Sequence, residues 1–175
     1  GQTLDVRIDK VRNGNAEGTA CAVIKESDIV DESIRCEHFG RCGGCVYQPV
    51  RYEEQLKLKS AQIEKLLAPV GGDYIYEGIK GSPEVAEYRN KMEFSFGDEV
   101  KDGPLSLGMH KRGSFHDIVT VSGCRIMDGD FRSILSATLD YFKNSGVTFY
   151  KKLAHTGYLR HLLVRKAKRT QELLV

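Results

Sequence analysis

The sequence predicts an α+β fold in which one antiparallel sheet and two helices accompany a site of four cysteines. Short segments after residue 88 alternate apolar and polar residues, which is the period of a strand with one buried face. Two longer segments instead repeat apolar residues at the spacing of an amphipathic helix. Four of the five cysteines have a spacing typical of metal ligands, Cys36-x5-Cys42-x2-Cys45 with Cys124 far downstream.

The 175 residues, 41% hydrophobic and 29% charged, are ordinary for a soluble globular protein of one or two domains. No apolar run reaches the roughly 20 residues of a membrane span. Residues 1–10 lack the charged and apolar regions of a signal peptide. We therefore expect a cytoplasmic protein with no membrane partner.

The first 33 residues are expected to form a small β unit. Residues 4–12 and 18–25 have the composition of two strands, and the turn-forming residues 13–15 join them. Val6 and Ile8 flank a polar residue, which predicts a half-buried strand. The polar residues 26–35 are expected to connect this unit to the next domain.

The two predicted helices cover residues 52–67 and about 129–144. The first has an apolar face at Leu56, Ile63 and Leu66/Leu67. The start of the second can be capped by either Asp128 or Asp130. Its predicted buried stripe consists of Phe131, Ile134, Leu135, Thr138, Leu139 and Phe142.

The strands of the antiparallel sheet are expected at residues 88–96, 105–109 and 117–122, with one face exposed to water. Segments 158–165 and 172–175 are expected to form a final hairpin, whose tip is basic. The stretch from Tyr141 to Gln171 contains no acidic residue and eight cations. It indicates either a polyanion partner such as nucleic acid, or a solvated face whose acidic complement lies elsewhere.

The spacing of the cysteines favours a [4Fe–4S] cluster and leaves a structural zinc ion as the alternative. The C-x-x-C pair lets two thiolates converge, and Gly43 and Gly44 between them permit a tight loop. A local trio with one remote cysteine recurs in iron–sulfur proteins. His38 could replace a cysteine on zinc, but we expect it to be a solvent-facing loop residue, and Cys21 to be a buried thiol outside the site.

The run 36–45, Cys-Glu-His-Phe-Gly-Arg-Cys-Gly-Gly-Cys, resembles the cluster motif of the RNA uridine-5-methyltransferase family, the bacterial rRNA and tRNA 5-methyluridine enzymes. Residues 1–33 resemble the second half of a TRAM domain, a small RNA-binding β-barrel. The similarity to the family's central domain covers about residues 34–175 and includes the segments 52–57, 88–94, 108–113, 124–127 and 157–162.

The resemblance implies a [4Fe–4S] cluster on Cys36, Cys42, Cys45 and Cys124 that is structural or aids RNA binding. It also implies that S-adenosylmethionine is the methyl donor and that rRNA or tRNA is the substrate. In the family, a cysteine thiolate adds to uracil C6 so that C5 can accept the methyl group. Those residues lie in a Rossmann-like domain after the central domain. The sequence has no G-x-G, so we expect this domain and its catalytic residues to be absent and the chain alone to be inactive.

RNA contacts are expected from cations, which bind phosphates, and from aromatic side chains, which stack on unpaired bases. Each residue that we name below as a candidate RNA contact has an alternative role, as a solvated surface charge or, for Phe115, as a core contact. Two other functions stay open, a zinc-stabilised RNA-binding module and an electron carrier of ferredoxin type. The candidate RNA-binding residues are Arg89, Lys91, His110, Lys111, Arg112 and Phe115.

Overall fold

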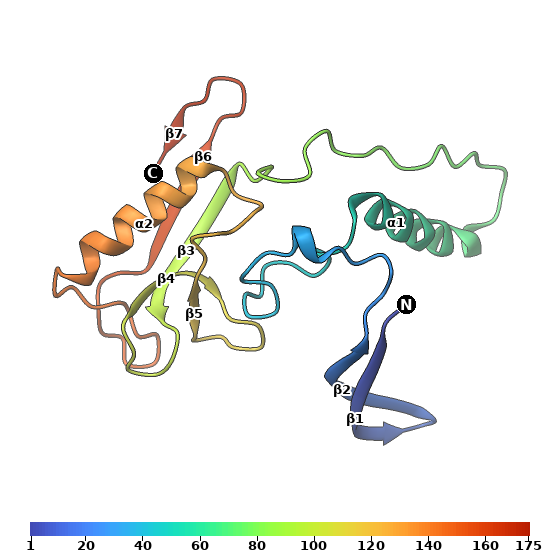
Figure 1. Ribbon diagram of the computed structural model, residues 1–175, viewed down its shortest axis with the longest axis horizontal. Coiled ribbons are helices and arrows are strands. Elements are labelled where there is room, and N and C mark those ends of the chain that lie inside the picture. The colour runs from blue at the N-terminus through green and yellow to red at the C-terminus, as the bar shows by residue number, and fades with distance from the viewer. The chain divides into compact units, whose positions relative to one another are not determined.

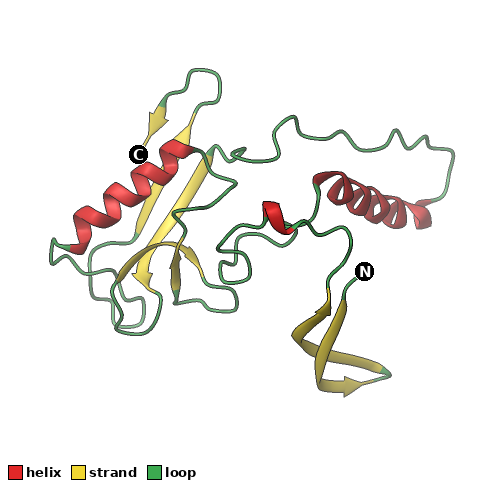
Figure 2. Ribbon diagram, viewed as in Figure 1, coloured by secondary structure: helices red, strands yellow, loops and turns green.

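The computed structural model describes all residues 1–175 (Figure 1). It divides into two compact units, residues 1–35 with 49–80, and residues 36–48 with 81–175. The predicted α+β class is confirmed, since both units contain antiparallel strands and each contains one α-helix (Figure 2). The predicted domain boundary at residues 33/34 remains a prediction. The contact-based division assigns the helix at 52–67 to the first unit.

The first unit contains a two-stranded antiparallel sheet, β1 (Thr3–Arg12) and β2 (Asn15–Lys25). Asn13 and Gly14 turn the chain between them with φ of 51° and 77°, a left-handed conformation that both residue types tolerate. The predicted half-buried face is wrong for this chain, because every residue of both strands is exposed. A two-stranded ribbon has no second layer to cover either face. A barrel is not tested by this hairpin.

Cys21 lies on β2 and is exposed, so the expectation of a buried thiol is wrong. Its apolar neighbours in the sequence suggested burial, but they belong to the same uncovered ribbon. Its Sγ lies 3.6 Å from the carbonyl oxygen of Thr19. Cys21 belongs to the first unit, whereas the other four cysteines belong to the second.

The helix α1 spans Tyr52–Leu67, as predicted, and continues into the short 3-10 helix η2 (Ala68–Val70). Its apolar face is not part of a core, because α1 contains no buried residue and Leu66 is 71% exposed. A second 3-10 helix, η1 (Glu32–Ile34), precedes it. No helix of the chain has both the length and the apolar character that crossing a membrane requires.

The second unit is built on a five-stranded antiparallel sheet with the order β5-β4-β3-β6-β7. Its strands are β3 (Lys91–Asp98), β4 (Leu105–His110), β5 (Ile118–Thr120), β6 (His161–Lys166) and β7 (Leu173–Leu174). The predicted strands are therefore confirmed, although β3 begins three residues later than expected and β5 is shorter. The predicted hairpin near the C-terminus is the pair β6 and β7.

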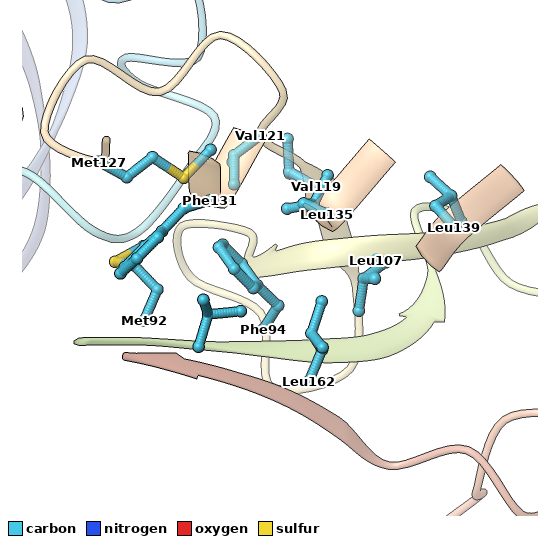
Figure 3. Packing of buried hydrophobic residues seen from close by; sticks show 11 residues of the cluster. Met92, Phe94, Leu107, Val119, Val121, Met127, Phe131, Leu135, Leu139 and Leu162 are labelled. Atoms are coloured by element: carbon cyan, nitrogen blue, oxygen red, sulfur yellow. The ribbon is translucent and has the colours of Figure 1, made fainter. Parts of the chain in front are cut away.

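The helix α2 (Gly129–Lys143) packs across one face of this sheet and closes the core (Figures 1 and 3). Of the two predicted caps, Asp128 is the one found, because its side chain accepts a hydrogen bond from the backbone N–H of Asp130 in the first turn. Each fully buried Val, Leu, Phe or Met side chain of the core stabilises the fold by roughly 1.5–3 kcal/mol. The core consists of Met92, Phe94, Leu107, Val119, Val121, Met127, Phe131, Leu135, Leu139, Leu162 and Val164.

The opposite face of the sheet is wet, as the alternation predicts. On β3 the residues Lys91 and Glu93 are exposed between the buried Met92 and Phe94. On β6 the residues His161, Leu163 and Arg165 are exposed in the same way. This face is free to carry polar and charged side chains that act on a ligand.

Candidate functional site

The loop that carries three of the cysteines is a compact series of turns between residues 36 and 48. The backbone N–H of Cys42 donates to the carbonyl of His38 at 2.9 Å, and that of Phe39 donates to Cys36 at 2.9 Å. Gly40 takes a φ of 90°, which favours glycine. The N–H of Cys36 donates to the side chain of Gln48 at 2.7 Å, so the two ends of the loop are tied together.

This cysteine loop is docked on the end of β4. The N–H of Gly43 donates to the carbonyl of His110 at 2.9 Å, and the N–H of Arg112 donates to the carbonyl of Arg41 at 2.7 Å. The Arg112 side chain reaches back and donates to the carbonyl of Cys45 at 2.8 Å. Cys42 and Cys45 are therefore held against the sheet through backbone groups, independently of any thiol chemistry.

The fourth cysteine follows β5 in a turn that contacts the same loop. The N–H of Gly123 donates to Nε2 of His38 at 3.2 Å. The carboxylate of Glu37 also lies against Gly123, so the cysteine loop contacts this turn through two neighbouring residues. The guanidinium of Arg132 donates to the carbonyl of Cys124 at 3.2 Å. The fold thus brings a residue 79 positions beyond Cys45 to the cysteine loop.

His38 is buried, and the expectation of a solvent-facing loop residue is wrong. Its ring accepts the Gly123 hydrogen bond instead of facing water. No local pattern around His38 predicts this burial, because the partner backbone group belongs to a distant turn.

All four cysteines are free thiols of intermediate burial, and they act on one another electrostatically. Burial raises the pKa of the Cys45 thiol, and the nearby Cys124, Cys42 and Cys36 raise it further. Burial is also the main cause of the raised pKa of the Cys124 thiol, to which Cys36 and Cys42 contribute. Cys36 and Cys42 thus lie close enough to both Cys45 and Cys124 to act on their thiols.

The donor set fits a metal centre in number and type, and it already has one supporting hydrogen bond. The N–H of Gly44 lies 3.3 Å from Sγ of Cys42, which is the kind of contact that offsets negative charge on sulfur. No group of three or more His, Cys, Asp or Glu side chains is arranged to hold one metal ion. A zinc ion needs its sulfurs about 2.3 Å from a single point. In a cluster each thiolate binds a different iron, which tolerates a wider spacing.

The six candidate RNA-binding residues fall in three places on the second unit. Arg89 and Lys91 lie at the start of β3, where Lys91 is 3.7 Å from Glu93. Arg112 supports the cysteine loop, and its guanidinium also lies 5.8 Å from the centre of the Phe39 ring. The other three lie near the opposite end of β3, beside a pocket. Their roles in binding RNA remain a prediction.

This pocket has a volume of about 490 Å³ and lies over the wet face of the sheet. His110 and Phe115 line it, as does Asp117, which forms an ion pair with Lys111 at 3.7 Å. The end of β3 with the turn after it, the chain segment 149–154, and residues 160–161 at the start of β6 also line it. The lining combines aromatic rings, cations and three histidines.

Sequence reasoning missed the residues that dominate this pocket. The guanidinium of Arg160 lies 3.6 Å from the centre of the Tyr150 ring, so the two form a stacked pair. Lys151, Lys152 and His161 also line the pocket. The run Phe-Tyr-Lys-Lys at 149–152 is a local signal of aromatic and basic residues that could have suggested it.

The basic hairpin tip is partly neutralised within the chain. Lys166 forms ion pairs with Asp128 at 2.9 Å and Asp130 at 2.7 Å, and Lys168 pairs with Glu84 at 2.7 Å. For these two lysines the acidic complement lies elsewhere in the sequence, which is one of the two interpretations that charge alone left open.

The chain is similar in sequence to proteins named RNA methyltransferases. The whole chain is 46% identical to an uncharacterized RNA methyltransferase of Caldanaerobacter subterraneus subsp. tengcongensis and 45% identical to one of Clostridium acetobutylicum. It covers 39% and 38% of these relatives, so it spans about two fifths of their length. No family model matches the chain.

A solved structure shares the fold. The tRNA (uracil-54, C5)-methyltransferase of Pyrococcus abyssi, in complex with S-adenosyl-L-homocysteine, matches with a TM-score of 0.66 at 19% identity. The match covers 95% of this chain and 36% of that protein. The resemblance to RNA methyltransferases predicted from the sequence is confirmed by these relatives.

Proposed function

We propose that this chain is the RNA-binding, cluster-carrying part of an S-adenosylmethionine-dependent methyltransferase that acts on C5 of uracil in rRNA or tRNA. The observation that carries the proposal is the similarity of the complete chain to proteins named RNA methyltransferases. The fold shared with a tRNA uracil-C5 methyltransferase supports the choice of uracil C5. A cytoplasmic location follows from an RNA substrate of this kind.

The chemistry that we propose needs a methyl donor and a nucleophile outside these 175 residues. A thiolate adds to uracil C6, C5 takes the methyl group from S-adenosylmethionine, and loss of the C5 proton then releases the enzyme. Cys21 is the one cysteine outside the four-cysteine set, and it lies on a hairpin of the first unit. We therefore expect residues 1–175 alone to transfer no methyl group and to contribute RNA binding instead.

For the metal centre we propose a [4Fe–4S] cluster held by Cys36, Cys42, Cys45 and Cys124. Its bonds would join the cysteine loop to the turn after β5, two segments that the structure already links through His38 and Gly123. The effect of neighbouring cysteines on the thiols of Cys45 and Cys124, and the N–H of Gly44 beside Cys42, support this choice. The centre would thus act as a structural brace and not as the methylating group.

Anaerobic purification followed by iron, sulfide and zinc analysis tests the cluster. We expect iron and sulfide with broad visible absorption, lost in Cys124→Ser and retained in Cys21→Ser, which is the matched control. Stoichiometric zinc without iron or sulfide would overturn the cluster and favour a zinc-stabilised RNA-binding module.

Methyl transfer is tested with the protein as its gene encodes it, labelled S-adenosylmethionine and total RNA from cells that lack the gene. We expect label in RNA and 5-methyluridine on nuclease digestion followed by mass spectrometry. Label in a different nucleoside, or none in any RNA, would contradict the proposed reaction. Residues 1–175 alone serve as the inactive control.

A further inference from the structure

The pocket over the wet face of the sheet has features that the cysteine centre does not explain. It lies beside the ends of β3 and β4 and the start of β6, away from the buried core under α2. Phe115 and Leu153 on its wall are each 89% exposed. Large apolar side chains that stay in water at the rim of a concave site mark a binding surface.

We propose that this pocket binds one unstacked base of single-stranded RNA and that its lysines hold the phosphates on either side. This inference rests on the proposed function, because it names the site at which the second unit would hold its RNA. The volume of about 490 Å³ lies within the roughly 300–1,000 Å³ typical of small-ligand sites, which is ample for a nucleobase and its sugar.

The pocket offers flat surfaces on which a base can stack. Arg160 lies over the Tyr150 ring at 3.6 Å and extends that aromatic surface with a cationic plane. Lys151 lies 5.7 Å from the centre of the Phe149 ring, which adds a second pair of the same kind. Bases stack on aromatic rings and on guanidinium planes, and this preference is tolerant of sequence.

The charges around the pocket favour an anion. Asp102 is 3.5 Å from Lys151, and Asp117 is 3.7 Å from Lys111, so two of the carboxylates are paired. Lys101 and Lys152 line the pocket without an ion pair in the chain. These lysines can bind the phosphate groups that flank an inserted base.

Polar groups that line the pocket can contact a base edge. His161 lies on β6 with its Nδ1 3.3 Å from Oγ of Ser95, and His110 and His116 line the same pocket. Imidazoles and hydroxyls both donate and accept hydrogen bonds, as base edges do. A paired base in a duplex cannot enter such a site, so the occupant is a base in a loop, bulge or single strand.

Binding is tested with the protein as its gene encodes it and a fluorescent uridine hexanucleotide. Phe115→Ala and Arg160→Ala should each weaken binding about 5- to 100-fold, the range expected for loss of one stacking partner. Phe115 is almost fully exposed. The hydrogen bond between Arg160 and Phe96 uses the Arg160 backbone carbonyl, and the Arg160 side chain stacks on Tyr150 at the pocket, so neither change should unfold the protein. Tyr141→Ala and Lys143→Ala on α2, which covers the other face, are the matched controls and should bind as the parent does.

Competition and cross-linking identify the occupant. An RNA duplex and inorganic phosphate should compete poorly, and 4-thiouridine in the hexanucleotide should cross-link to residues of segment 149–161 or to Phe115. Equal affinity of all four variants would overturn the assignment of RNA binding to this pocket. Cross-links that form only at other residues would do the same. Uridine monophosphate that binds as tightly as the hexanucleotide would show a free-nucleotide site and overturn the RNA assignment.

Methylation separates failure of this inference from failure of the proposed function. If the protein methylates uridine in RNA and the pocket variants bind the hexanucleotide as the parent does, the proposed function stands and the assignment of RNA binding to this pocket is wrong. If the protein neither methylates RNA nor binds the hexanucleotide, both the proposed function and the pocket assignment are wrong.

Discussion

The two compact units alternate apolar and polar residues in the same way, but only the second buries the apolar set. Val6 and Ile8 on β1 have the same spacing as Met92 and Phe94 on β3, yet the first pair is exposed and the second is buried. The difference is the helix α2, which covers one face of the five-stranded sheet. A hydrophobic pattern therefore specifies which face can be buried, and a second layer decides whether it is.

The largest expected effect comes from creating a cavity in the core that α2 covers. Phe131→Ala removes a fully buried ring of α2, and we expect it to lower the free energy of unfolding by about 3–5 kcal/mol. Denaturant unfolding of the purified protein measures this. The matched change in α1, Ile63→Ala, should cost no more than about 1 kcal/mol, because that side chain is 44% exposed and lies outside the buried core. Similar losses for the two variants would remove the contrast between the units.

A second test probes how closely the sheet strands approach. Gly108 on β4 lies against β5, where a side chain would overlap the carbonyl group of Val119. Gly108→Ala should therefore destabilise the protein by roughly 1–3 kcal/mol, since the strands must shift. The control is Gly1→Ala, which meets nothing, and thermal unfolding compares the two. Unchanged stability of Gly108→Ala would show that the sheet is looser than the register implies.

A third test compares the starts of the two helices. Asp128 caps α2, whereas α1 has no side-chain cap. The backbone N–H of Asp130 and then the Lys166 ammonium hold the pKa of the Asp128 carboxyl below its usual range. Asp128→Ala should cost about 0.5–2 kcal/mol at neutral pH.

The pH dependence of that cost has a definite sign. The carboxyl's contribution is fully present above its unfolded pKa of about 3.9 and disappears as the pH falls through the lower folded value. Unfolding measured from pH 7 down to pH 2 should therefore show the parent and Asp128→Ala converging below about pH 4. A difference that persists undiminished at the acid end would mean that the effect is not electrostatic.

The smallest effect is expected on the exposed face of α1. Leu66→Lys should change the free energy of unfolding by less than about 0.5 kcal/mol, because Leu66 is mostly in water. The same substitution at the buried Leu135 of α2 is the contrasting control. A large loss for Leu66→Lys would mean that this face is covered by a partner in solution.

Secondary structure was the best-predicted part of the molecule, because its signals are local. The periods of α1 and α2, the capping position of Asp128 and the turn at Asn13-Gly14 all depend on neighbouring residues, and the structure has them where the sequence predicts them. Strand ends were less certain. The start of β3 and the length of β5 depend on hydrogen bonds to partners elsewhere in the chain.

For the candidate sites, the sequence by itself determined the four cysteines and their resemblance to a cluster motif, since spacing along the chain limits which thiols can meet. Only the tertiary structure decided that Gly123 and His38 join the turn after β5 to the cysteine loop. It alone placed Arg160 on Tyr150 beside a pocket and paired Lys166 with Asp128. These contacts join residues that the chain separates, and burial and charge pairing act through space, so no local pattern encodes them.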